Sequence, residues 1–157
     1  MSFRSRISLT NLREPIPTYN CVAYSRRAKI PPMAAKGNNK LVAIVDDDDS
    51  LRVALEGLLR SAGLTARAFG SAEEFIGSGQ QFDTACLIAD IRMPGMSGLE
   101  LQAKLNAEHC RIPIVFITGH GDAQMRMRAL RAGAVEFLTK PFNDEALLET
   151  VRAALEN

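Results

Sequence analysis

From Leu41 onward the chain alternates short apolar runs with helix-like segments five times, and this alternation constrains the fold more than any other feature. Each apolar run is too short for a helix and is rich in Val, Ile, Leu or Phe, which is typical of strands buried on both faces. The five predicted strands are Leu41–Asp46, Thr65–Phe69, Ala85–Asp90, Pro113–Thr118 and Val135–Leu138. Five such units predict an α/β fold with a doubly wound, five-stranded parallel sheet between two layers of helices.

The segments between the strands carry local signals for helix ends. The first helix follows Asp49, which suits an N-cap, and stops at Gly63, which suits the left-handed position after a helix. Two further helices are predicted to begin with S-x-x-E capping boxes, in which each side chain satisfies a backbone N–H. These boxes are Ser71 with Glu74 and Ser97 with Glu100. The last two helices start near Asp122 and Asn143.

Residues 1–39 lack this alternation. They contain four prolines and show no sustained apolar period, so we expect a disordered extension. The first forty residues hold eight Lys and Arg against one Glu, which gives them a charge of +7 and leaves −6 for the remaining 117. Such a segment suits a basic arm for nucleic acid or a membrane surface, or a transit peptide. The favoured interpretation is a non-native leader, with translation starting at Met33.

The length and composition point to one ordinary globular domain. A chain of 157 residues with 46% apolar and 24% charged residues can bury one core, placed here at residues 40–157. No window is long and apolar enough for a membrane span and no secretory signal is present, so we expect a cytoplasmic protein without a membrane partner. Cys21, Cys86 and Cys110 are odd in number and scattered, which favours neither disulfides nor zinc.

Polar side chains gather where the predicted strands end. Asp46 and Asp47 follow the first strand, Asp90 ends the third, Thr118 ends the fourth and Lys140 follows the fifth. Doubly wound sheets bind ligands at the carboxyl ends of their strands, so these five side chains are expected to converge. Clustered carboxylates repel each other unless a cation compensates them, and oxygen ligands without a His or Cys pair at zinc spacing favour Mg²⁺.

A carboxylate beside a metal, a lysine and a hydroxyl suits phosphoryl transfer. The transferring group carries negative charge on three oxygens, and each needs a partner. In this interpretation Asp90 is the nucleophile, while Mg²⁺, Lys140 and the Thr118 hydroxyl each neutralise one oxygen.

Four segments resemble the signature stretches of bacterial response-regulator receivers, nearest to the nitrogen-fixation and LuxR-type transcription regulators. They are IVDDDDSLR, LIADIRMPGMSGLEL, IVFITGHGD and GAVEFLTKPF, and the resemblance covers Leu41 to Leu155. It implies a flavodoxin-like (βα)5 receiver domain with strand order 2-1-3-4-5. It also implies a switch in two-component signalling that accepts a phosphoryl group from a sensor histidine kinase or phosphotransfer protein and acts on a downstream protein target. Beyond its own Mg²⁺-dependent phosphorylation and dephosphorylation, no enzyme activity is implied.

The resemblance assigns the metal and acceptor residues by position. Asp90 is similar to the phosphoacceptor, and Asp46, Asp47, Asp90 and the backbone carbonyl of Arg92 are similar to the magnesium ligands. Because four aspartates follow one another from Asp46 to Asp49, the resemblance does not by itself decide which two of them bind the metal. Asp46 and Asp47 are preferred because the strand ends there, and whether Asp48 takes part stays open.

The remaining positions form a switch. Thr118 is similar to the family's switch hydroxyl, Phe137 to its switch aromatic and Lys140 to its phosphate-binding lysine, and the peptide before Pro141 is expected to be cis. A phosphoryl group attracts Thr118 inward, and Phe137 can fill the vacated space. This changes the surface of the fourth helix, fifth strand and fifth helix. Residues expected on this surface are Met125, Arg126, Met127, Arg128 and Arg131. A phosphorylation-dependent homodimer stays open.

Two rival interpretations come from other classes. Asp46-x-Asp48-x-Ser50 resembles the nucleophile motif of haloacid-dehalogenase-type phosphatases, with Asp46 as the nucleophile, but that reading leaves Asp90 unexplained. The chain could also be a fragment of a DNA-binding response regulator. Too few residues follow Leu155 for a helix-turn-helix, so no direct DNA binding is expected. His120 is expected to line the rim of the site without a catalytic role.

Overall fold

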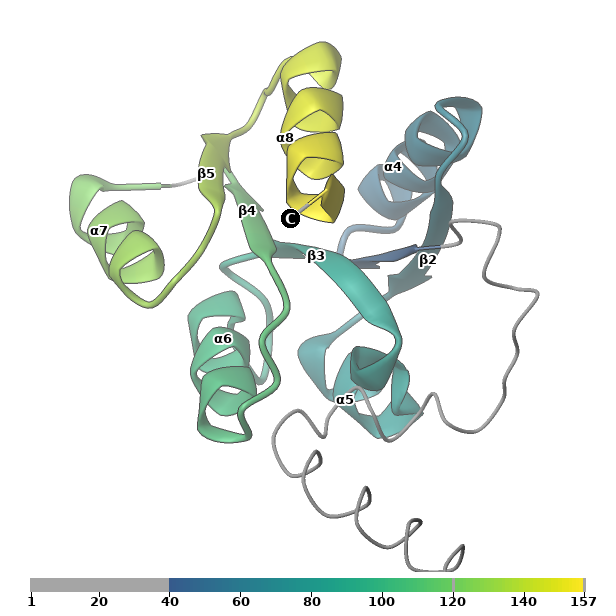
Figure 1. Ribbon diagram of the computed structural model, residues 1–157. Coiled ribbons are helices and arrows are strands. Elements are labelled where there is room, and N and C mark those ends of the chain that lie inside the picture. Colours follow the sequence, from purple (N-terminus) through teal and green to yellow (C-terminus); the bar gives the residue numbers. More distant parts are fainter. Residues whose placement is uncertain (1–39, 120, 157) are drawn as a thin grey trace, which may run out of the picture.

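Five strands form one parallel sheet in the computed structural model, which describes residues 40–119 and 121–156 (Figure 1). The strands are β1 (Leu41–Val45), β2 (Thr65–Phe69), β3 (Thr84–Asp90), β4 (Ile114–Thr118) and β5 (Glu136–Thr139). Their order across the sheet is β2-β1-β3-β4-β5, and every neighbouring pair is parallel. The predicted doubly wound sheet and its strand order are confirmed, and predicted strand ends differ from the observed ones by at most one residue. The N-terminal extension and His120 lie outside the described residues.

Helices cover both faces of this sheet. They are α4 (Asp49–Ser61), α5 (Ala72–Ser78), α6 (Gly98–Ala107), α7 (Ala123–Arg131) and α8 (Asp144–Glu156), with a short 3-10 helix η1 (Gln80–Phe82) before β3. In Figure 1, α4 and α8 lie on one face, α5 and α6 on the other, and α7 lies beside the β5 edge. Among the described residues, none of the helices combines the length and the apolar character that crossing a membrane would require.

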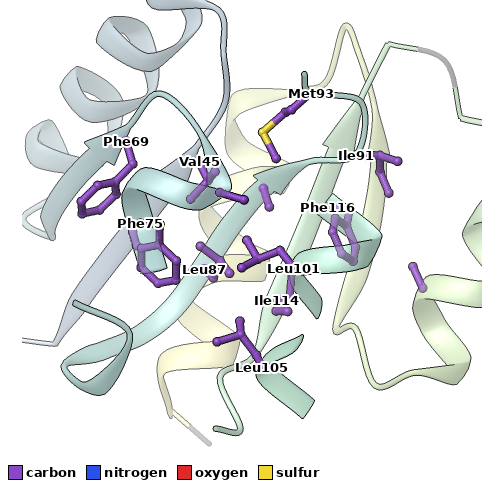
Figure 2. Close-up of a cluster of buried hydrophobic side chains, with 14 of the residues drawn as sticks. Val45, Phe69, Phe75, Leu87, Ile91, Met93, Leu101, Leu105, Ile114 and Phe116 are labelled. Atoms are coloured by element: carbon purple, nitrogen blue, oxygen red, sulfur yellow. The ribbon is translucent and has the colours of Figure 1, made fainter. Parts of the chain in front are cut away.

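Each face of the sheet has its own apolar core, because successive residues of a strand point to opposite faces. On one side Phe75 of α5 and Leu101 of α6 pack against Val45 and Phe116 (Figure 2). On the other side α4 and α8 contribute to a separate cluster. Its fully buried side chains include Val42, Ile44, Leu55, Leu59, Leu147 and Val151. Two cores on one sheet explain why the strands read as unbroken apolar runs.

The start of α4 differs from the prediction. The N-cap is Asp48 and not Asp49, since the Asp48 carboxylate accepts hydrogen bonds from the backbone N–H of Ser50 (3.0 Å) and Leu51 (3.2 Å). Asp48 keeps an extended backbone, whereas Asp49 already belongs to the helix and pairs with Arg52. In a run of four acids, the point where the backbone becomes helical decides which one caps the helix.

The two predicted capping boxes form to different extents. At α6 both halves are present, with Ser97 accepting from the N–H of Glu100 and Glu100 accepting from the N–H of Ser97. At α5 only the first half of the box forms, with the Ser71 hydroxyl accepting a hydrogen bond from the N–H of Glu74. The Glu74 carboxylate accepts instead from the N–H of Gly70 at 2.7 Å, one residue before the cap. The prediction that the Glu74 carboxylate accepts a hydrogen bond from the N–H of Ser71 is therefore wrong.

The thiol of Cys86 yields a test of the core. Cys86 has no exposed surface, and burial raises its pKa to about 12. Because the thiolate is the reactive form, iodoacetamide near pH 8 is expected to leave Cys86 unmodified in the folded protein and to alkylate it in urea. Mass spectrometry of the peptide containing Cys86 measures this difference. Equal alkylation rates in both conditions would contradict the buried placement.

Candidate functional site

The predicted site residues meet where the strand order reverses. From β1 the sheet continues to β2 on one side and to β3 on the other, which is the switch point where doubly wound sheets bind ligands. Val45 pairs with Ala89 in register, so the residues that follow them, Asp46 and Asp90, emerge side by side. Thr118 ends the next strand, β4. Backbone pairing alone therefore brings together groups that are far apart in the sequence.

Three carboxylates form a compact acidic cluster at this edge. Oxygens of Asp46, Asp47 and Asp90 all lie within 4.8 Å of one another. Asp46 is fully buried and Asp90 is 6% exposed, whereas Asp47 is exposed at the rim. The donors are all oxygens, and one side of the cluster faces solvent. This donor set fits a hard divalent cation such as Mg²⁺, which binds through a few carboxylates and keeps several waters.

Lys140 bridges the two buried carboxylates. Its Nζ lies 3.4 Å from Asp46 Oδ2 and 3.5 Å from Asp90 Oδ2. Its backbone N–H donates to the Thr118 carbonyl at 2.8 Å, which joins the ends of β4 and β5. The peptide bond between Lys140 and Pro141 is cis, as the family resemblance implied. The lysine thus places one positive charge between Asp46 and Asp90.

The pKa of Asp46 is raised above its usual value. Burial is the main cause, and the negative charge of Asp90 adds to it. The backbone N–H of Asp48, which donates to Asp46 Oδ1 at 2.9 Å, and the ammonium of Lys140 act in the opposite direction without cancelling the effect. Ionised Asp46 is therefore a destabilising group in the absence of a cation.

The other predicted residues surround the cluster. Thr118 is 1% exposed, and Phe137 on β5 is 4% exposed. The backbone N–H of Arg92 lies 3.4 Å from Asp90 Oδ1, so the loop after β3 folds back over the Asp90 carboxylate. The residues predicted from the strand ends and described by the structure thus all lie at one edge of the sheet.

The loop after Asp90 is closed by a tight contact at the start of α6. The N–H of Gly98 donates to the Ile91 carbonyl at 2.8 Å. A Cβ atom on Gly98 would lie 2.2 Å from the Asp90 carbonyl oxygen, which no side chain tolerates. Gly98 therefore lets α6 begin directly against the end of β3 and fixes the backbone that carries the Asp90 carboxylate.

Two supporting contacts were not anticipated from the sequence. Arg52 on α4 donates from Nη1 to the Asp46 carbonyl at 2.6 Å. Glu73 on α5 accepts at 2.7 Å from the N–H of Met96, 23 residues away in the loop after β3. The sequence offers a signal only for the ion pair of Arg52 with Asp49, three residues apart on one helix. Both new contacts depend on how a helix sits on the sheet.

Together, the fold and the site define a doubly wound α/β protein with an acidic cluster, bridged by a lysine, at its switch point. A profile described as "Response regulator receiver domain" matches residues 42–152. This match covers well over half of the chain, and the protein belongs to the response regulator receiver domain family of two-component systems.

Individual relatives agree with this assignment. The chain is 51% identical over 116 residues to Nodulation protein W of Bradyrhizobium diazoefficiens, covering 74% of this chain and 51% of that protein. It is 48% identical over 116 residues to the response regulator protein TmoT of Ectopseudomonas mendocina, covering 74% and 53%. The crystal structure of FixJ-N matches with a TM-score of 0.69 and 39% identity, covering 75% of this chain and 94% of that one. The chain thus spans about half the length of these curated relatives.

Family membership bears on the phosphatase alternative drawn from the sequence. Receiver domains are signalling domains and not classical enzymes, and the comparisons give no support to the phosphatase alternative. The geometry agrees, because the carboxylate of Asp48, the second acid of the supposed phosphatase motif, is engaged as the cap of α4.

A pair of glycine substitutions tests the contact between Gly98 and the Asp90 backbone. Gly98→Ala is expected to lower the free energy of unfolding by about 1–3 kcal/mol, because its Cβ would overlap the Asp90 carbonyl. Gly57→Ala is the matched control: nothing lies within 4 Å of a Cβ at this exposed position of α4, and alanine should stabilise the helix by about 1 kcal/mol. Urea unfolding measures both. An unchanged or raised stability in Gly98→Ala would refute the close approach.

The raised pKa of Asp46 yields a second test. Protonated Asp46 stabilises the folded state, and this stabilisation is complete at a pH below the pKa that Asp46 has in the unfolded chain. It is lost as the pH rises through the higher pKa that Asp46 has in the folded protein. At neutral pH in EDTA, Asp46→Asn is therefore expected to melt a few degrees above the wild type, and the difference should shrink as the pH falls towards about 4. Asp83→Asn, at an exposed position before β3, serves as the control. Calorimetric melting of Asp46→Asn at or below the wild-type temperature would contradict the assignment.

Proposed function

We propose that the protein is a phosphorylation switch in which Asp90 accepts a phosphoryl group from a sensor histidine kinase or a phosphotransfer protein. One observation carries this proposal. Asp90 is a nearly buried carboxylate beside Asp46, Asp47 and the Lys140 ammonium at the switch point of the sheet. Aspartyl phosphorylation and magnesium binding are also typical of the family to which the chain belongs.

The transfer requires an in-line attack by Asp90. One carboxylate oxygen forms a bond to the phosphorus of the donor phosphohistidine while the bond from phosphorus to the imidazole nitrogen breaks. The electron pair of that bond leaves with the imidazole, and the product is an aspartyl phosphate. Lys140 is already 3.5 Å from the Asp90 carboxylate and is positioned to pair with a phosphoryl oxygen. The Thr118 hydroxyl is proposed to bind another.

Asp46, Asp47 and Asp90, with the backbone carbonyl of Arg92, are the residues that would hold Mg²⁺. Their fit rests on the oxygen donors, which lie within 4.8 Å of one another, and on the burial of Asp46, which is the main cause of its raised pKa and disfavours an uncompensated carboxylate there. When bound, the ion supplies positive charge that offsets the carboxylates and the phosphoryl oxygens. Asp48 is left out of this set because its carboxylate caps α4.

The output of the switch is proposed to run through α7, β5 and α8. Thr118 and Phe137 connect the acceptor to this surface, which also carries the α7 arginines. The surface is proposed to bind a downstream protein target or a second phosphorylated copy of the chain. Several relatives are named transcriptional regulatory proteins, which supports a role in transcriptional control. We further propose a cytoplasmic location, because a sensor histidine kinase would present its phosphoryl group there.

Small phosphodonors test the proposal without knowledge of the kinase. With Mg²⁺ and phosphoramidate, the wild type is expected to gain the mass of one phosphoryl group, and Asp90→Asn should gain none. Asp83→Asn, an exposed aspartate at the opposite end of β3, is the control and should be labelled normally. Intact-protein mass spectrometry, repeated in EDTA, measures both effects.

Two outcomes would count against Asp90 as the acceptor. One is full labelling of folded Asp90→Asn. The other is continuous turnover of the phosphodonor that disappears only in Asp46→Asn, which would favour the phosphatase chemistry. Circular dichroism spectra of each variant establish that loss of labelling does not come from unfolding.

A further inference from the structure

Arg126 on α7 contacts both the backbone and the ring of Phe137 on β5. Its Nη1 donates a hydrogen bond to the Phe137 carbonyl at 3.0 Å, and its Cζ lies 5.9 Å from the centroid of the Phe137 ring. Arg126 itself is exposed, whereas Phe137 is 4% exposed. One surface cation therefore covers a buried aromatic residue and ties α7 to the edge strand of the sheet.

The covered ring reaches towards the phosphorylation site. A Cβ atom on Gly121 would lie 2.6 Å from Phe137 Cε1 and 3.1 Å from Thr118 Cγ2. The edge of the ring and the Thr118 methyl group thus both lie against the backbone of Gly121. In this position the Phe137 ring and the Thr118 side chain pack against the same glycine.

The charge pattern of α7 would favour a solvent-exposed guanidinium at Arg126, so its contact with Phe137 requires a local attraction. Residues Ala123–Arg131 include three arginines and no acid, so repulsion favours pointing each guanidinium into solvent. Arg128 lies in a groove of about 620 Å³ with Met93, Pro94 and Met125. Arg126 lies instead over Phe137, where the ring face and the carbonyl oxygen both attract a cation.

We propose that Arg126 is a positioning residue of the switch, which holds the Phe137 ring in its buried position and thereby favours phosphorylation of Asp90. This inference rests on the proposed roles of Thr118 and Phe137. A buried ring keeps Thr118 from turning towards β5 and leaves its hydroxyl on the side of the acceptor. Coupling of this kind is reciprocal, so the phosphoryl group and Arg126 both stabilise the same ring position.

The first test needs no phosphorylation. In Mg²⁺-free protein, NMR ring-current shifts of the Thr118 methyl group and of the Gly121 protons report where the Phe137 ring lies. Arg126→Met keeps the aliphatic stem but removes the cation and the donor, and it is expected to move these shifts towards their random-coil values. Arg126→Lys restores the charge and should recover part of the change. Arg111→Met, an exposed arginine before β4, is the control and should leave the shifts unchanged.

The second test measures the consequence for the acceptor. The initial rate of labelling by phosphoramidate is expected to fall about two- to fivefold in Arg126→Met, the effect of losing one exposed cation–aromatic contact, and to stay constant in Arg111→Met. Wild-type ring-current shifts in Arg126→Met would overturn the proposal, as would an unchanged labelling rate. If no protein is labelled, including the wild type, the phosphorylation switch fails, whereas the NMR comparison still decides whether Arg126 holds the ring.

Discussion

The enforced closeness of Asp46 and Asp90 is the interaction on which the rest of the site depends. Parallel pairing of β1 with β3 places both carboxylates at one buried edge, where burial and the negative charge of Asp90 disfavour the ionised form of Asp46. Lys140 compensates only part of this charge, from 3.4 and 3.5 Å. In the proposed function, the negative charge that Lys140 leaves uncompensated favours binding of a cation, and that cation would offset the charge of a phosphoryl group at the same edge.

Holding two carboxylates in place requires a backbone that cannot relax away from them. The start of α6 meets the end of β3 at Gly98, and Arg52 holds the carbonyl of Asp46 from α4. Glu73 on α5 accepts a hydrogen bond from the backbone N–H of Met96 and so holds the loop after Asp90 in place. These contacts come from helices on both faces of the sheet, so the rigidity of the site is a property of the whole layered fold.

Local signals predicted the helices and strands well. They failed at two helix starts, where neighbouring groups could form the same hydrogen bond. The five strands followed from apolar runs that are buried on both faces of the sheet, whereas their order across the sheet followed from the family resemblance. The cap of α4 was misassigned because Asp48 and Asp49 are chemically equal, and only the backbone conformation separates them. The α5 box failed in its second half because the Glu74 carboxylate had two neighbouring N–H groups within reach.

The sequence by itself determined the architecture and the chemical identity of the site, because the pattern of apolar runs and the polar residues that end them are local properties of the chain. Tertiary structure decided which groups support that site. Arg126 reads as one of three equivalent arginines on a solvated helix, and only the packing of α7 beside β5 selects it to cover Phe137. Such a choice depends on distances between segments, and spacing along the chain does not encode them.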